Sequence, residues 1–194
     1  MTKNDILKLF PIETDRLILR LATVDDAHLI QSAKESHHPD TLRRWMSWSS
    51  EEGMSMQATL DYLTMATSQD NTRCIAILGI DKTTHTHVLS TGFDAEDDDF
   101  NVVSTGWWLS DGHEGKGLAF EGMSSLLDLC RQNRICQKVI SDHFEGNQRS
   151  QNLMNRLGFQ YVETKTKSHQ CHLDGAFHDV LHYEVSINDV SYID

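Results

Sequence analysis

Single-residue alternation of apolar and polar side chains marks the first regular element of the chain. Leu17, Leu19 and Leu21 are each separated by one residue in TDRLILRL, residues 14–21. A period of two places these side chains on one face of a strand. Residues 14–21 are therefore predicted to form a strand with one buried face.

Helical spacing follows this strand in three segments. Thr23 is a favourable N-cap, two aspartates follow it, and apolar residues then recur at helical intervals as far as Ser36. A second helical stretch is predicted around 41–46. A third is predicted to begin at Ser49 or Ser50 and to run to about Ser68.

The second half of the chain alternates between strand-like and helix-like segments. Runs rich in β-branched and aromatic residues predict strands at 74–81, 87–93, 102–110, 138–144, about 159–166 and 179–186. Helices are predicted at about 116–132 and 150–156. This order indicates an α+β fold with a mixed sheet, and the strand, turn, helix and strand in the middle permit a parallel crossover.

Composition and charge narrow the class of protein. The chain has 194 residues, of which 39% are apolar and 24% charged, as expected for one globular domain over 1–194. No apolar run approaches the roughly 18 residues of a membrane span, so a cytoplasmic protein without membrane contact is expected. A net charge of −12 argues against nucleic acid as a partner. The four cysteines show no metal-binding spacing and are expected to be free thiols.

Two glycines flank a lysine just before the helix predicted at 116–132. Gly115, Lys116 and Gly117 follow a strand and would leave unpaired backbone N–H groups at the positive end of the helix dipole. This arrangement favours an anion site, and the alternative is a flexible turn with a capping glycine. The spacing matches neither a P-loop nor a dinucleotide-binding motif.

Two ordered motifs resemble those of the GNAT acyl-CoA-dependent N-acetyltransferases. EGKGLA, residues 114–119, resembles the phosphate-binding motif Gln/Arg-x-x-Gly-x-Gly/Ala, with Glu114 where the family usually has Gln or Arg. Asn147, Ser150 and the Gly158-Phe159 pair resemble the later family element. Residues 13–27, 106–123 and 176–186 are similar to the RimJ/RimL-type branch, so the likeness covers nearly the whole chain.

The resemblance implies the GNAT fold and direct acetyl transfer from acetyl-CoA to an amine. The expected fold has a central, mostly antiparallel seven-stranded sheet with a splayed parallel pair, flanked by helices. A backbone N–H near Trp108 or Leu109 would stabilise the oxyanion, and Ser150 would be the acid on the thiol side, its alternative being a helix N-cap. The cofactor-binding residues expected are Trp108, Leu109, Gly115, Lys116, Gly117, Leu118, Ala119, Asn147 and Asn152.

The general base is less determined than the cofactor site. The branch can use a late glutamate, but residues 167–175 contain none, so His169 or His172 could replace it, with Glu145 and His143 as rivals. A metal site built on His169, His172, His178 and His182 is not expected, because His169 and His172 are three apart and would face opposite sides of a strand. Three tryptophans are expected at the acceptor pocket, with core packing as the alternative: Trp45, Trp48 and Trp107.

The acceptor predicted from the resemblance is the α-amine of a protein N-terminus, that of a ribosomal protein. Two alternatives remain open. One is acetylation of a small amine such as a polyamine or an aminoglycoside, which the negative charge would accommodate, and the other is a non-catalytic acyl-CoA-binding module. The resemblance is also compatible with a homodimer paired at the sheet edge.

Overall fold

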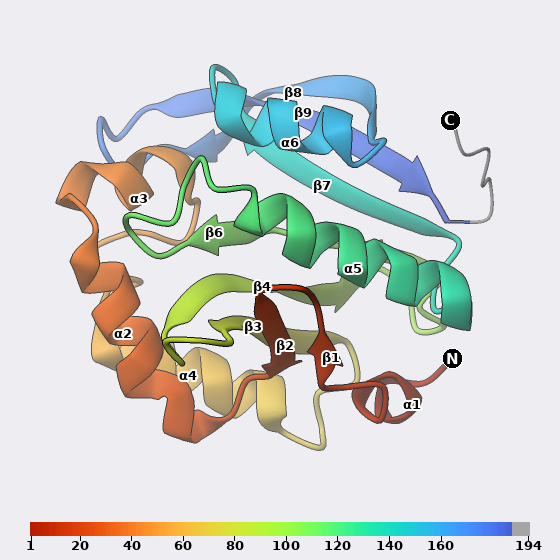
Figure 1. Cartoon of the computed structure of the whole chain (residues 1–194). Helices are drawn as coiled ribbons and strands as arrows, with labels where there is room; N and C mark the ends of the chain where they lie inside the picture. Colours follow the sequence, from red (N-terminus) through yellow and green to blue (C-terminus); the bar gives the residue numbers. More distant parts are fainter. Residues whose placement is uncertain (188–194) are drawn as a thin grey trace.

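Nine strands and seven helical segments make up the part of the chain that the computed structural model describes, residues 1–187 (Figure 1). The helical segments are α1 (Lys3–Leu7), the 3-10 helix η1 (Val24–Asp26), α2 (Ala27–Ser36), α3 (Pro39–Trp45), α4 (Met56–Thr67), α5 (Leu118–Asn133) and α6 (Gln148–Arg156). The strands are β1 (Ile12–Glu13), β2 (Leu17–Leu21), β3 (Cys74–Asp81), β4 (His87–Ala95), β5 (Val102–Ser104), β6 (Trp107–Leu109), β7 (Lys138–Phe144), β8 (Gln160–Gln170) and β9 (Phe177–Ser186).

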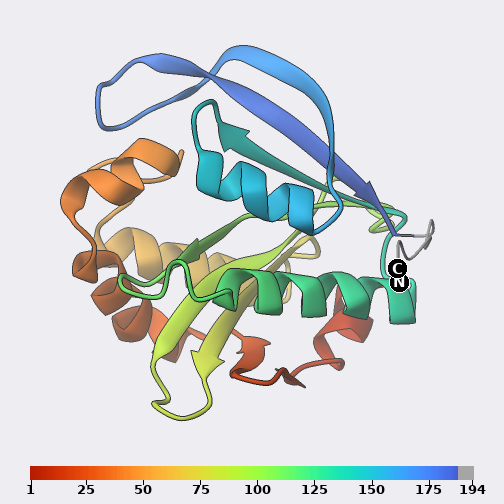
Figure 2. The ribbon, with the colours of Figure 1, turned by 45° about the horizontal axis from the view of Figure 1, so that its top comes forward.

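The strands form one mixed sheet in the order β1-β2-β3-β4-β5-β7-β9-β8, with β6 also paired to β4. β5 and β7 run parallel, and the other strand pairs are antiparallel. α5 and α6 lie side by side in both ribbon views (Figures 1 and 2), and α2 packs on α4. The predicted α+β fold with a mostly antiparallel sheet and one parallel pair is confirmed.

The two largest of the three apolar clusters lie on opposite faces of the sheet. The larger joins the sheet to α5 and α6 and contains Leu17, Leu19, Leu89, Met123 and Leu126, all inaccessible to solvent. The smaller lies under α2 and α4. The alternation in the first strand explains the larger core, because Leu17 and Leu19 point to the same side of β2.

The sheet has nine strands rather than the predicted seven, because β1 was not predicted and because the segment predicted as one strand at 102–110 is two. Asp94 pairs with Ser104 and Thr91 with Trp107, so β5 and β6 share one register along β4. Between them, side chains replace the ladder: Thr91 Oγ1 donates to the Gly106 carbonyl at 2.8 Å, and Thr105 Oγ1 to the Gly92 carbonyl at 2.8 Å.

The break in pairing between β5 and β6 also lets β6 diverge from β7. β5 pairs with β7 from Val102 to Ser104, and the Thr105 N–H still donates to the Ile140 carbonyl at 2.9 Å. β6 is paired only to β4 in the described sheet. The parallel pair therefore opens after Thr105, as a V with β6 and β7 as its arms.

Other boundaries differ from the prediction for local reasons. Ser49 does not begin the third helix, because its hydroxyl donates to the carbonyls of Leu42 and Met46 at the end of α3. α4 begins later, where the Ser55 side chain accepts the N–H of Ala58 at 3.1 Å. α6 begins earlier than predicted, at Gln148. α1 and β1 were not predicted.

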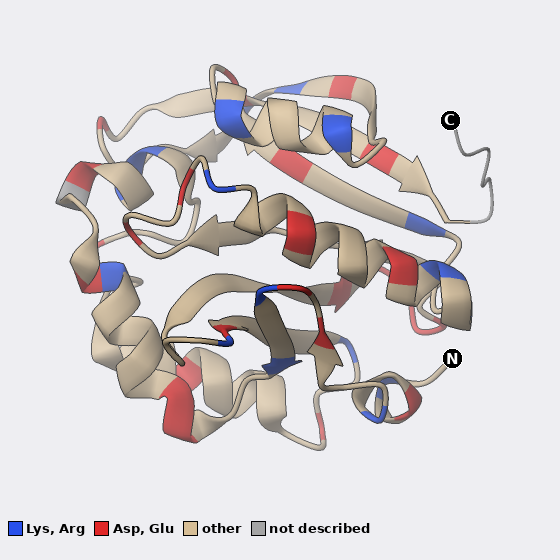
Figure 3. Ribbon diagram, in the orientation of Figure 1, with Lys and Arg blue, Asp and Glu red and all other residues tan. Residues whose placement is uncertain are grey.

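The four cysteines are buried free thiols, as predicted. Within residues 1–187, no helix is long and apolar enough to cross a membrane. Acidic and basic residues are interspersed over the ribbon (Figure 3).

The close approach of β4 to β3 requires a glycine, which yields a stability prediction. A Cβ at Gly92 would lie 2.4 Å from the Ile75 carbonyl oxygen, and backbone cannot move aside as a side-chain tip can. Gly92→Ala should therefore lower the free energy of unfolding by about 2 kcal/mol, the usual cost of overpacking.

Gly106→Ala is the matched control, because a Cβ there would meet no atom within 4 Å. Chemical denaturation of both variants measures the difference. Equal stability of the two would show that the contact at Gly92 does not constrain the sheet.

Candidate functional site

The turn that opens α5 has the backbone geometry of an anion cradle. Gly115 and Gly117 adopt φ of +73° and +78°, in the left-handed region that favours glycine. Gly117 is the N-cap of α5 and supplies no side-chain cap to its first N–H groups. A Cβ at Gly115 would stand in open space, so conformation rather than crowding requires glycine there. The positive end of the α5 dipole thus faces an open, polar turn.

A salt bridge from the start of β2 holds this turn in place. Arg16 donates through Nη1 to the Lys116 carbonyl at 2.9 Å and through Nε to Glu121 Oε2 at 2.7 Å. Burial alone would raise the pKa of Glu121, but hydrogen bonds from Thr14 and Arg16 outweigh it and hold the pKa below its ordinary value. Arg16 therefore holds the Lys116 carbonyl in place and balances the negative charge of Glu121, the one acid in the first turn of α5.

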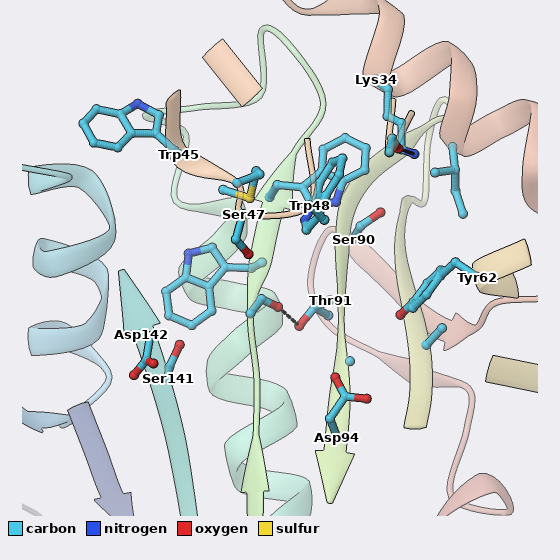
Figure 4. A pocket seen from close by; sticks show the side chains of 18 of the residues that line it. Lys34, Trp45, Ser47, Trp48, Tyr62, Ser90, Thr91, Asp94, Ser141 and Asp142 are labelled. Atoms are coloured by element: carbon cyan, nitrogen blue, oxygen red, sulfur yellow. Dashed lines mark hydrogen bonds between the residues drawn. The ribbon is translucent and has the colours of Figure 1, made fainter. Parts of the chain in front are cut away.

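A cavity of about 490 Å³ lies where β6 and β7 separate. Its wall includes residues from both layers of helices and from the sheet between them. Figure 4 shows side chains that α2, α4, β4 and β7 contribute. Lys34 and Tyr62 line it from the α2 and α4 side, and Asn147 and Ser150 from the start of α6. A single cavity thus reaches both faces of the opened sheet.

Strand alternation decides which amides of β6 face the opening. The Thr105 N–H donates toward β7, whereas the Ser110 N–H donates to the Val88 carbonyl beside β4. Successive residues alternate sides, so Trp107 and Leu109 present their N–H groups to the opening and Trp108 presents its own to β4. Of the two oxyanion donors predicted, Trp108 and Leu109, the geometry favours Leu109.

The tryptophans lie on different faces of the sheet. Trp108 stands with Trp48, whose ring centroid is 6.0 Å away, and with His87 at 5.3 Å. Trp107 was predicted at the acceptor pocket, but it packs against the core beneath α5, although it also borders the cavity. Trp45 packs near Phe144 on the cavity wall. Trp48 and Trp108 are therefore the aromatic pair of the α2–α4 side.

Lys34 lies over this aromatic pair. It is buried, donates to the Gly53 carbonyl at 3.1 Å and to Thr59 Oγ1 at 2.8 Å, and its Nζ is 5.1 Å from the ring of Trp48. Burial lowers its pKa. In the sequence, Lys34 is distinguished only by its position in a predicted helix, so its place in the cavity wall could not be predicted.

The predicted catalytic residues are not all brought together. Ser150 lines the cavity, and its N–H donates to Asn147 Oδ1 at 3.2 Å, so Asn147 and not Ser150 caps α6. His169 lines the cavity from β8, with its ring 6.2 Å from that of Phe144. Glu145 is exposed in the turn after β7 and is not among the lining residues.

The two predicted asparagines also separate. Asn147 is buried and lines the cavity. Asn152 is exposed on α6, where it accepts a hydrogen bond from Gln148 Nε2 at 2.9 Å. The structure therefore brings Asn147, but not Asn152, to the cavity wall.

Carboxylates border the cavity on two strands. Asp142 on β7 is bonded to His182 and accepts from Lys165 Nζ at 3.1 Å. Asp94 on β4 lies near Cys74, and burial, reinforced by this charge, raises the pKa of Cys74 to about 12. The Cys74 thiol is therefore held protonated and is a poor nucleophile.

Glu114, the departure from the family motif, turns toward the end of α2. Its carboxylate lies with a ring nitrogen of His37 and a carboxylate oxygen of Asp111, all within 4.8 Å of one another. Cys171, Asp174 and His178 form a second group of this kind. These are the two groups in residues 1–187 with the proximity needed to hold a metal ion, and the absence of a metal stays a prediction.

The family model for the acetyltransferase (GNAT) domain matches residues 16–160, and the chain belongs to this family of acetyltransferases. No curated protein matches it in sequence.

Solved structures share its fold. RimL, a ribosomal α-N-protein acetyltransferase in complex with coenzyme A, has a TM-score of 0.81 and 17% identity over 92% of this chain and 98% of its own. A ribosomal-protein alanine acetyltransferase from Vibrio fischeri has a TM-score of 0.78 and 17% identity, covering 93% and 98%. The microcin C7 self-immunity acetyltransferase MccE, in complex with acetyl-CoA and AMP, has a TM-score of 0.77 and 16% identity, covering 89% and 93%.

The buried His87 beneath Trp108 gives a prediction for the pH dependence of stability. Its ring nitrogens bond Ser110 Oγ at 2.6 Å and Ser90 Oγ at 2.8 Å. Burial, with smaller contributions from the charges of His113 and Arg20, lowers its pKa to about 4. The unfolded chain binds this proton more readily, so stability is complete above the unfolded pKa and falls as the pH drops from about 6.5 towards 4.

At pH 5 this loss should amount to about 2 kcal/mol relative to pH 7.5. Urea unfolding at the two pH values measures it. His87→Gln should remove most of the loss, and His28→Gln, at an exposed site on α2, controls for the removal of a histidine as such. An unchanged pH dependence in His87→Gln would contradict the assignment.

Proposed function

We propose that this chain transfers the acetyl group of acetyl-CoA directly to an amine, and that the acceptor is the α-amine of a protein N-terminus, that of a ribosomal protein. The observations that carry the proposal are one cavity in the opened sheet, where β6 is paired to β4 and not to β7 among the described residues, and an α5 N-terminus that has no side-chain cap. Family membership and the names of two neighbours of the same fold, both ribosomal-protein acetyltransferases, support it.

The turn at 115–117 fits the pyrophosphate of coenzyme A. Its two glycines hold left-handed conformations, and the Cβ space at Gly115 is open for an anion to approach the backbone. The residues proposed to hold the anion are Gly115, Lys116, Gly117, Leu118 and Ala119. Glu114 turns toward His37, which leaves these amides as the main contacts. Bound here, acetyl-CoA supplies an activated thioester.

Acetyl transfer needs an oxyanion donor, an uncharged amine and a proton for the departing sulfur. The Leu109 N–H is proposed as the oxyanion donor, because it faces the opening between β6 and β7. Ser150 is proposed to donate a hydrogen bond on the thiol side. His169 is the cavity-lining candidate for accepting the proton of the amine.

A second candidate acceptor is a small cationic amine, which one feature of the cavity favours. Asp94 on β4 and Asp142 on β7 both border it. A polyamine or an aminoglycoside would place several ammonium groups near these carboxylates. The free α-amine of a protein carries only one positive charge at this position, so the two acceptor classes differ in the charge they bring.

Release of free thiol from acetyl-CoA tests the proposal and its rival. Peptides beginning with Ser or Ala and lacking Lys should support turnover, and the same peptides with a blocked N-terminus should not. Turnover with polyamines or aminoglycosides, and none with the peptides, would show that the acceptor is a small amine. Binding of coenzyme A without thiol release for any amine would overturn the enzymatic proposal and leave a binding module.

The contribution of Ser150 is tested by Ser150→Ala. Loss of one hydrogen bond to the departing sulfur should lower kcat about tenfold with little change in the affinity for coenzyme A. Asn155→Ala, at an exposed position of the same helix, should leave both quantities unchanged. Steady-state kinetics and calorimetric titration measure the two effects, and an unchanged kcat in Ser150→Ala would remove Ser150 from the mechanism.

A further inference from the structure

His143 on β7 is a buried histidine in the wall of the cavity. Its side chain is 6% exposed and borders the same space as Asn147 and Ser150. Its ring stacks on Tyr183, with centroids 5.3 Å apart and an interplanar angle of 28°. The ring is therefore held in one orientation by an aromatic partner.

The hydrogen bonds of the ring define its protonation. Nδ1 lies 2.8 Å from the Phe144 carbonyl oxygen, which can only accept, so Nδ1 carries a hydrogen. Nε2 is buried and has no hydrogen-bond partner among the described residues. A buried polar atom without a partner costs roughly 1–3 kcal/mol, so a native structure retains one where something else binds it.

Strand geometry places His143 on the α6 side of the sheet. Tyr183 faces α6, because its hydroxyl accepts from Gln151 Nε2 at 3.2 Å. His143 stacks on Tyr183 and so shares that side, together with the start of α6 and Ser150. Phe144, one residue on, packs with Trp45 on the opposite side. His143 thus borders the half of the cavity next to α6, away from Trp48 and Trp108.

Ser150 alone is a weak acid for this half of the cavity. A serine hydroxyl donates a hydrogen bond readily but holds its proton too tightly to lose it without immediate replacement. An imidazole nitrogen can give a proton and take one back, as general acids do. His143 has such a nitrogen, free and fixed in direction, on the wall that it shares with Ser150.

We propose that Nε2 of His143 contacts the sulfur of coenzyme A and supplies the proton that the sulfur takes when acetyl leaves. This inference rests on the proposed function. Nε2 first takes up a proton from water while Nδ1 keeps its own. As the amine nitrogen bonds to the acetyl carbon, the C–S electron pair passes to sulfur, and Nε2 gives this proton to that sulfur. The amine releases one proton to His169, which passes it to water, and His143 takes up a new proton from water, so the protein is unchanged at the end of the cycle.

Two substitutions separate a chemical role from packing. His143→Gln keeps a polar side chain that cannot transfer a proton, and His143→Phe keeps an aromatic ring for Tyr183 to stack on. Both should lower kcat about 10²-fold, the usual range for a general acid, while the dissociation constant of coenzyme A changes less than threefold. Near wild-type kcat in His143→Phe would reduce His143 to a packing residue and overturn the proposal.

A covalent trap tests proximity to the sulfur without relying on activity. His143→Cys, incubated with the disulfide form of coenzyme A, should exchange to a mixed disulfide and release one coenzyme A thiol. Intact-mass analysis should show one added coenzyme A, removed by dithiothreitol and blocked by excess acetyl-CoA. The wild-type protein, whose four thiols are buried, gives the background.

His28→Cys, at an exposed site on α2, controls for unspecific exchange and should not be protected by acetyl-CoA. An adduct in His143→Cys that forms no faster and is equally unprotected would overturn the proposal. A third readout needs no substitution: coenzyme A should shift the ¹⁵N resonance of Nε2 of His143 in the wild-type protein, and an unmoved resonance with coenzyme A bound would also refute it. Failure of wild-type protein to bind coenzyme A would instead refute the proposed function.

Discussion

The replacement of backbone pairing by two threonine hydroxyls, between β5 and β6, is the constraint on which the rest of the site depends. Thr91 and Thr105 each satisfy a carbonyl across the strand pair, so the chain keeps its register along β4 while losing two rungs of the ladder. Without these side chains the carbonyls of Gly92 and Gly106 would lack those bonds. With them, β6 can separate from β7 without leaving these carbonyls unpaired, and the sheet opens.

The opening gives one cavity two distinct walls. On the α2–α4 side the wall is aromatic, with Trp48 and Trp108, and carries the buried Lys34. On the α6 side it is polar, with Asn147 and Ser150. Since the strand amides lie between these walls, a group bound at the opening can be reached from either face of the sheet. An enzyme that brings two substrates together without a covalent intermediate needs such an arrangement.

Local signals in the sequence predicted most elements but not the features created by distant partners. Residues 74–81 and 138–144 form strands as predicted, because their own composition demands burial. The break at Thr105 could not be predicted, since it depends on Thr91, fourteen positions earlier by sequence number. In the site, the glycine turn was recognisable because positive φ is a local requirement. The positions of Glu145 and Asn152 outside the cavity, by contrast, depend on how β7 and α6 are oriented.

The link from Arg16 to the Lys116 carbonyl joins residues 100 positions apart, and it makes the turn that opens α5 depend on the start of β2. The turn keeps this geometry only when β2 is docked, so the affinity of any ligand for the turn would be thermodynamically linked to the docking equilibrium of β2. A ligand held by the turn would protect the amides of β2 from hydrogen exchange. Substitutions that loosen the N-terminal strand would in turn act as affinity variants, although they touch no ligand.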